Sequence, residues 1–347
     1  KNIEYPAEDG VYDELLAKQL IENMFVKSTL LENDIPVISY LPEHGYQIMG
    51  EGDSGEDITA DIEPPITDIG EEETVPDNET LVKEVFKPKL IGTEYSMSQL
   101  EDFDFLLRKF YAVESNTTVN TSILNVEKML SYDMALAKSK EASPQILIYH
   151  THSTEEYADS REGVVSDTVV GMGSYLEEIL ERDYGYEVMH VTTPFDCLNG
   201  KLDRSAAYAY AEGALDGILK TYPDIEVIID LHRDGVNEDV RLVTEYNGKK
   251  AAKIMFVNGI SRMENKSISY LDNPNLAGNL AFSFQLQLKG EAYFPGLMRR
   301  IIIKAYRYNL HYEPRSVLVE LGAQTNTVEE ARNSVELLAF MIGEVLK

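Results

Sequence analysis

The segment QILIYHTHSTEE (residues 145–156) begins as a run of apolar side chains and changes after Tyr149 to histidines, hydroxyls and carboxylates. A short, nearly continuous apolar run is typical of a strand covered by helices on both faces. In an open α/β sheet, functional groups collect beyond the carboxyl ends of such strands. The segment therefore predicts a buried strand whose end carries ligand-type residues.

Four more short apolar runs follow, separated by longer helical patterns. The runs are YEVMHV (186–191), EVIIDLH (226–232), AKIMFVNG (252–259) and SVLVELG (316–322), and helices are expected near 166–182, 203–220, 276–289 and 328–346. We expect Asp203 to cap the second helix, which ends before Pro223. This alternation is typical of a mostly parallel sheet flanked by helices, so residues 141–347 are expected to form one α/β domain.

The residues before this domain divide into three parts. We expect an N-terminal helical segment at 1–50, where apolar residues recur at helical spacing. Residues 51–80 hold 12 acidic side chains and no basic one, which predicts an acidic linker. Residues 81–140 regain helical spacing and predict a helical accessory region packed on the α/β domain, with Ser98 and Glu101 as a capping box.

The composition excludes several classes of protein. The net charge is -29, from 60 Asp and Glu against 31 Lys and Arg, and no Lys/Arg run offers a surface for nucleic acid. The single cysteine, Cys197, excludes an intramolecular disulfide and a Cys-rich zinc framework. No stretch reaches the about 18 consecutive apolar residues of a transmembrane helix, and the sequence begins at Lys1, so we expect a soluble or a trimmed chain.

Two of the apolar runs end in residues that bind metals. A catalytic zinc ion takes three protein ligands from His, Asp or Glu and keeps a fourth position for water. His152 and Glu155 stand one turn apart after the first run, and His232 ends the run at 226–232. We expect these three residues to bind a zinc ion.

Glu320 interrupts the last apolar run, between Val319 and Leu321. An unpaired carboxylate is costly to bury, so this side chain needs a partner, and a metal-bound water is a good one. Zinc lowers the pKa of its bound water to about 7, and a nearby carboxylate then carries the proton to the departing nitrogen. We expect Glu320 to be this general base and acid.

Three neighbouring residues leave alternatives open. Alternation along the strand would point the side chains of His150 and His152 the same way, so His150 could replace His152 as the metal ligand. In the other alternative, His150 contacts the ligands without binding the metal. We favour His152, which has a carboxylate three residues on. Asp230 accepts the N–H of a ligand imidazole or closes the strand with a backbone contact. Arg233 binds a substrate carboxylate or forms a salt bridge with Asp230 or Asp234.

Five stretches together resemble the stage II sporulation protein P family, over roughly residues 90–347. They are ILIYHTHSTEEY (146–157), IIDLHRDG (228–235), IMFVNG (254–259), FPGLMRRI with YRYN downstream (294–309) and VLVELGAQTNTVEEA (317–331). The resemblance implies a zinc-dependent N-acetylmuramoyl-L-alanine amidase that also cuts peptide cross-links in peptidoglycan and works in forespore engulfment. It also implies a partner, the lytic transglycosylase stage II sporulation protein D.

The same resemblance implies a location and a set of site residues. Family members are anchored in the mother-cell membrane by an N-terminal helix that is absent here, which implies a trimmed, extracytoplasmic chain at the sporulation septum. In the similar, broader zinc amidases, ligands follow two strands and a catalytic Glu comes late, and His152, His232 and Glu320 match those places. Those amidases take a ligand Glu from the next helix, where this sequence has only Asp167, so Glu155 resembles the His-x-x-Glu pair of zinc carboxypeptidases.

The sequence thus predicts a zinc-dependent hydrolase that cuts the amide between N-acetylmuramic acid and L-alanine, with Glu320 and Arg233 as catalytic residues. A metallopeptidase acting only on stem peptides would share every site residue. A catalytically inactive, wall-binding scaffold would keep the fold and bind no metal.

Overall fold

The structure is a computed structural model that describes residues 86–138, 143–198 and 200–347. The helical segment and the acidic linker predicted for residues 1–80 lie outside these residues. Within the described part of the chain, no helix combines the length and apolar character needed to span a membrane.

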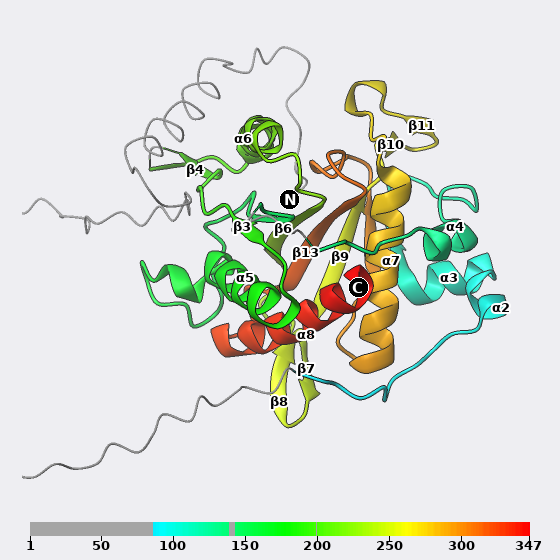
Figure 1. The fold of residues 1–347 in the computed structure, drawn as a ribbon, viewed down its shortest axis with the longest axis horizontal. Helices are drawn as coiled ribbons and strands as arrows, with labels where there is room; N and C mark the ends of the chain where they lie inside the picture. The colour runs from blue at the N-terminus through cyan, green and yellow to red at the C-terminus, as the bar shows by residue number, and fades with distance from the viewer. Residues whose placement is uncertain (1–85, 139–142, 199) are drawn as a thin grey trace, which may run out of the picture. The chain divides into compact units, whose positions relative to one another are not determined.

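A seven-stranded sheet forms the centre of the described domain, in the order β1-β12-β9-β13-β6-β2-β3 (Figure 1). The strands are β1 Tyr111–Val113, β2 Ile146–Tyr149, β3 Val188–His190, β6 Val227–Asp234, β9 Ile254–Gly259, β12 Ile301–Lys304 and β13 Arg315–Ala323. All neighbouring strands are parallel except β9 and β13, which are antiparallel. The predicted mostly parallel sheet is therefore confirmed, and all five predicted strands belong to it.

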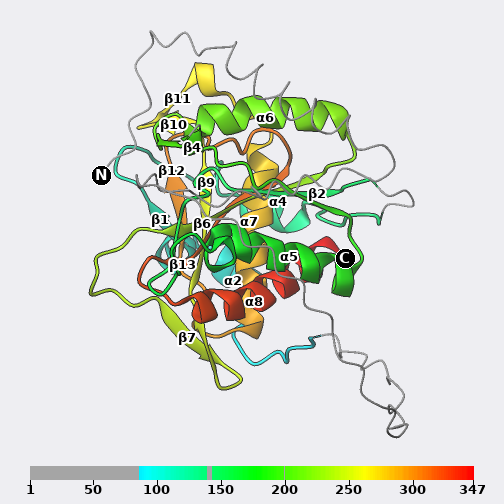
Figure 2. The ribbon, with the colours of Figure 1, turned by 90° about the vertical axis from the view of Figure 1, so that its left-hand side faces the viewer.

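Four long helices flank the sheet, as predicted. They are α5 Val169–Tyr184, α6 Ala207–Thr221, α7 Leu276–Tyr293 and α8 Val328–Leu346. In Figure 2, α5 and α8 lie on one side of the strands and α6 lies on the other. The N-cap of α6 is Ala206 rather than Asp203, whose carboxylate accepts hydrogen bonds from the N–H groups of Ser205 and Ala206 just before the helix (3.1 and 3.3 Å).

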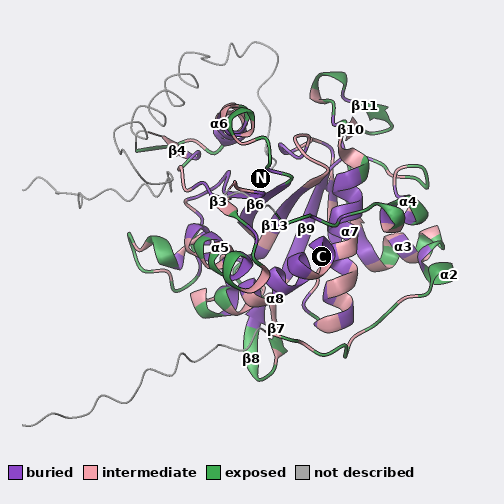
Figure 3. Ribbon diagram, viewed as in Figure 1, coloured by how far each residue is buried: buried purple, intermediate pink, exposed green. Residues whose placement is uncertain are grey.

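Alternation along the strands sends side chains to two different cores. In β2, Ile146 and Ile148 join the core under α5, α7 and α8, whereas Leu147 packs with α6. In β13, Val317 and Val319 join the first core, and Leu318 between them faces the other way. Figure 3 shows the strands as the most buried part of the domain. On the α6 side, residues of β9, β12 and β13 also line a groove.

The residues from 86 to 138 contribute both helices and a strand to this domain. The helices are α2 Met97–Leu100, α3 Phe103–Phe110 and α4 Val126–Ser131, and β1 extends the sheet beside β12. The capping box of α2 joins Ser96 and Gln99, not Ser98 and Glu101, because Glu101 is already the C-cap of this single-turn helix. The sequence pattern missed β1, which reads as a continuation of the helix before it, and it also missed β12.

Short elements complete the described chain. The hairpins are β4 Cys197–Leu198 with β5 Lys201–Leu202, β7 Val243–Tyr246 with β8 Lys249–Ala252, and β10 Arg262–Met263 with β11 Lys266–Ser267. Two single 3₁₀ turns, η1 Val165–Asp167 and η2 Ser269–Leu271, precede α5 and α7.

Candidate metal centre

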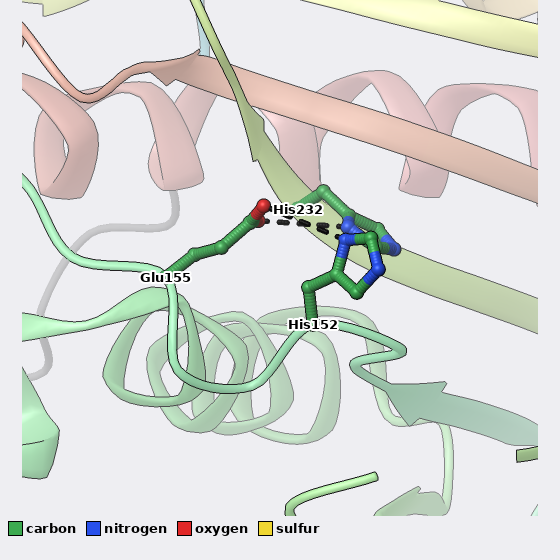
Figure 4. Close-up of side chains that lie close together, drawn as sticks. All are labelled: His152, Glu155 and His232. Carbon is green, nitrogen blue, oxygen red and sulfur yellow. Dashed lines mark ion pairs between the residues drawn. The ribbon is translucent and has the colours of Figure 1, made fainter. Parts of the chain in front are cut away.

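His152, Glu155 and His232 lie together where β2 and β6 end (Figure 4). His152 and Glu155 come from the turn after β2, and His232 comes from β6. One donor atom of each side chain lies within 4.8 Å of the other two. Glu155 Oε1 is 3.7 Å from His152 Nδ1, and Glu155 Oε2 is 3.5 Å from His232 Nδ1. The fold thus gathers the three residues selected by sequence spacing, and their role as ligands stays a prediction.

The three side chains are buried, so their charges interact with little screening by water. Burial raises the pKa of Glu155, but hydrogen bonds and charge from His152 and His232 outweigh it and hold this pKa well below its usual range. Burial lowers the pKa of His232, but the carboxylates of Asp230 and Glu155 overcome this effect and raise it. An ionised carboxylate beside two imidazoles is a donor set suited to a divalent cation.

Neighbouring groups hold the candidate ligands in place. The backbone N–H of Arg233 donates to Glu155 Oε2 (3.0 Å). Asp230 Oδ1 lies 2.8 Å from His232 Nε2, and the Asp230 carboxylate also accepts hydrogen bonds from the N–H and the hydroxyl of Thr151 (2.9 and 2.7 Å). Asp230 therefore makes the backbone contact expected of it and forms an ion pair with His232, and its role beside a ligand imidazole stays a prediction. A carboxylate against the second ring nitrogen is the usual support of a metal-bound imidazole.

A second buried carboxylate, Asp196, holds the turn that carries His152. It accepts hydrogen bonds from the hydroxyls of Ser153 and Thr154 (3.0 and 2.5 Å). Asp196 is more than 40 residues away from this turn along the chain, in a loop with no motif, so no pattern in the sequence points to it.

Glu320 lies on β13, level with His232 on β6 and with Met255 on β9. Its Oε2 atom is shielded from solvent and has no hydrogen-bond partner among the described residues. Burial, partly offset by the charge of His232 and reinforced by Glu155, raises the pKa of Glu320 to about 8. A carboxyl group that titrates near neutral pH is suited to proton transfer.

His150 points away from this centre. Its Nδ1–H donates to the carbonyl of Leu231 (2.7 Å), and its Nε2 lies 2.8 Å from His190 Nε2. Burial, with the nearby His190, lowers the pKa of His150 to about 3, so the ring is neutral. The expectation that His150 and His152 point the same way is wrong, because β2 ends before both and the chain turns between them. His150 instead supports the residue that precedes His232.

Two further predicted residues make other contacts. The Arg233 guanidinium donates to the carbonyls of Glu156 and Asp234 (2.8 and 3.2 Å) and, within the described residues, forms no salt bridge with a carboxylate. Asp167 pairs with Arg161 (2.6 Å) and is not part of the His152 cluster.

A groove of about 1360 Å³ opens over the centre, and its lining includes the three candidate ligands and Glu320. The ring of Tyr208, on α6, stands edge-on to the His152 ring with 5.7 Å between centroids. The site is therefore open to a large substrate.

The residues present fit a zinc ion. Two imidazoles and one carboxylate are ligands of the kind that hold a catalytic zinc and leave a position for water. The Nδ1 atoms of both imidazoles face the two oxygens of Glu155, at 3.7 and 3.5 Å.

Comparisons with known proteins agree with the sequence motifs. A curated relative, stage II sporulation protein P of Bacillus subtilis (strain 168), is 25% identical over 214 residues, which is 58% of this chain and 50% of that protein. The chain thus spans about half the length of this relative. Two solved structures are similar to this one. N-acetylmuramoyl-L-alanine amidase AmiC2 of Nostoc punctiforme has 16% sequence identity and a TM-score of 0.33, and the match covers 59% of this chain and 96% of that chain. The apo form of the N-acetylmuramyl-L-alanine amidase Ami1 from Mycobacterium abscessus has 14% identity and a TM-score of 0.35, and the match covers 58% of this chain and 98% of that chain. The family model "Stage II sporulation protein P (SpoIIP)" matches residues 27–343, and the chain belongs to this family.

Proposed function

We propose that this protein is a zinc-dependent hydrolase of amide bonds in bacterial peptidoglycan. The observation that supports it most is a buried cluster of two imidazoles and a carboxylate, beside a second carboxyl group and open to a groove. Membership of a sporulation protein family supports the cell wall as the substrate.

His152, Glu155 and His232 would hold the zinc ion, which supplies Lewis acidity to the scissile carbonyl and an acidified water when bound. Glu320 takes the proton from the attacking water and delivers it to the departing nitrogen. Its Oε2 atom is buried without a hydrogen-bond partner among the described residues, which leaves it available to a water bound at the centre. Arg233 positions Glu155 through its backbone N–H, and its side chain lines the groove.

We assign the amide between N-acetylmuramic acid and L-alanine as the main scissile bond. A peptide cross-link is a second substrate of the same site, since both scissile groups are amides. The family points to septal wall degradation in forespore engulfment, together with stage II sporulation protein D and at the mother-cell membrane.

Digestion of purified cell-wall sacculi tests the activity. With zinc, the chain is expected to release peptides that begin with a free L-alanine amino group, and a chelator is expected to stop their release. Products cut only between stem peptides would assign a metallopeptidase instead. Binding to sacculi without any soluble product, in a chain shown to contain zinc, would reject the hydrolase and favour a wall-binding scaffold.

A further inference from the structure

The groove over the centre is basic, although the chain as a whole is strongly acidic. Lys and Arg are outnumbered by Asp and Glu, 31 to 60, in the sequence, but six basic and three acidic residues line the groove. The basic residues are Arg204, Arg233, Lys253, Arg299, Arg300 and Lys304. An excess of basic residues in one groove of an acidic chain indicates that the groove receives an anionic ligand.

Four of these residues lie at one end of the sheet, and we name Arg233, Lys253, Arg299 and Arg300 the basic rim. Arg233 is near the end of β6, Lys253 precedes β9, and Arg299 and Arg300 precede β12. β12 runs parallel to β9, and β13 runs parallel to β6, but β9 and β13 are antiparallel. The first residues of β9 and β12 therefore lie at the same end of the sheet as the last residues of β6 and β13. Glu320 and His232 lie at that same end.

Backbone contacts draw the basic rim together next to Glu320. The Arg299 N–H donates to the carbonyl of Ile254 (2.8 Å), and the Gly322 N–H donates to the carbonyl of Lys253 (3.0 Å). Ile254 is the residue opposite Leu321 in the strand register, one position from Glu320. The rim therefore flanks the carboxyl group that is proposed to transfer the proton.

Only part of the rim's charge is neutralised by the protein. Arg299 pairs with Asp234 (2.7 Å). The exposed Arg300 guanidinium donates to the carbonyl of Tyr111 (3.3 Å) and forms no ion pair within the described part of the chain. The Lys253 ammonium has no ion-pair or hydrogen-bond partner among the residues that the structure describes, although the side chain is half-buried in the groove. Lys253 and Arg300 therefore offer two positive charges to a ligand.

We propose that the basic rim binds free carboxylates of the peptide portion of the substrate and so selects acidic peptides. This inference rests on the proposed function, because it places the peptide on the Glu320 side of the scissile amide. Wall stem peptides carry free carboxylates on acidic residues and at their C-termini. Arg binds a carboxylate through two parallel hydrogen bonds and Lys binds it as a point charge, and partial burial strengthens the attraction of Lys253.

The test compares two soluble disaccharide-peptides, one with free carboxylates and one with the carboxylates converted to methylamides. Isothermal titration calorimetry on the metal-free full chain is expected to show about tenfold tighter binding of the free acid. The double substitution Lys253→Met and Arg300→Met should abolish this preference. The substitution Lys250→Met, which removes an exposed lysine of β8 outside the groove, should keep it. Matching thermal midpoints establish that each variant is folded.

Equal affinities of wild type for the two ligands, or a preference that survives in the double variant, would overturn the proposal. The proposal would also be overturned if a phosphate-rich wall teichoic acid bound through Lys253 and Arg300 and displaced the free-acid ligand. Because binding is measured without metal, a chain that prefers the free acid but never cleaves sacculi would disprove the hydrolase and leave the rim's role standing.

Discussion

At the residue scale, Glu320 has the environment that most affects the chemistry. Burial and the nearby carboxylates of Glu155 and Asp234 disfavour the ionised form of this carboxyl group. The charge of His232 favours the ionised form, but less strongly. A divalent cation bound by His152, Glu155 and His232 would reverse this balance and favour the ionised form. Substitutions of Glu320 and His232 test these roles.

The substitution Glu320→Gln is expected to keep the zinc ion and slow hydrolysis by about 10²-fold to 10⁴-fold, because the amide cannot carry the proton. Zinc content by elemental analysis and the rate of peptide release from sacculi are the two measurements. Activity equal to that of the parent chain would reject the assigned role of Glu320.

The substitution His232→Ala is expected to remove the metal itself. It deletes one of three ligands and leaves Asp230 and Glu155 without the imidazole between them. Added zinc should raise the thermal midpoint of the parent chain and of Glu320→Gln, but not that of His232→Ala. A zinc-dependent rise that persists in His232→Ala would show that the ion binds elsewhere.

Metal-free protein is expected to lose stability as the pH rises from about 4.5 to about 8, relative to Glu320→Gln. The folded chain keeps the Glu320 proton up to a pKa of about 8, whereas the unfolded chain releases it near 4.5, so the unfolded state binds fewer protons between these values. The difference should reach on the order of 1–3 kcal/mol. Urea unfolding at pH 5 and pH 8.5 measures it, and a pH-independent difference would contradict the raised pKa.

At the element scale, α5 packs against two histidines that lie behind the candidate metal centre. Gly173 of α5 lies against His150 and His190, and His150 holds the carbonyl just before His232. A Cβ atom at this position would lie 2.6 Å from His190 Nε2 and 2.7 Å from His150 Nε2. The helix can therefore approach β2 this closely only with glycine there.

The substitution Gly173→Ala is accordingly expected to destabilise the fold by about 1–3 kcal/mol, despite the higher helix propensity of alanine. Zinc affinity should fall with it, since the histidine pair must move. The matched substitution Gly235→Ala, where a Cβ atom meets nothing within 4 Å, should be neutral or stabilising. Denaturant unfolding of both variants measures these changes in the free energy of unfolding. No loss of stability in Gly173→Ala would disprove this packing argument.

At the scale of the whole described domain, the residues before β2 are part of the main core. All described residues belong to one compact unit. Phe110 of α3 is fully buried in the same cluster as α7 and α8, and its ring lies edge-on to Phe284 of α7, with 5.4 Å between centroids. Together with β1 at the edge of the sheet, this contact ties the helices of 86–138 to the rest of the fold.

The substitution Phe110→Ala is therefore expected to cost about 3–5 kcal/mol, and the conservative change Phe110→Leu less than about 1.5 kcal/mol. Both variants should unfold in one transition, seen alike by calorimetry and by circular dichroism. A separate early transition in Phe110→Ala would mean that the helices of 86–138 fold independently.

The local features of this protein can be predicted from its sequence. Five of the seven sheet strands, four long helices and the polar residues at the ends of β2, β6 and β13 all follow from periodicity, since apolar spacing records which side of an element is covered. Family membership was also visible in the motifs, and the family match confirms it.

The other features become visible only in the folded chain, because strand order, strand direction and loop path depend on contacts between distant residues. Nothing local shows that β9 runs antiparallel to β13, that His150 turns away from His152, or that Asp196 supports the turn after β2. The basic rim is the clearest case. Arg299 and Arg300 are neighbours in the sequence, but they meet Lys253 and Arg233 only because the end of β6 and the starts of β9 and β12 converge at one end of the sheet.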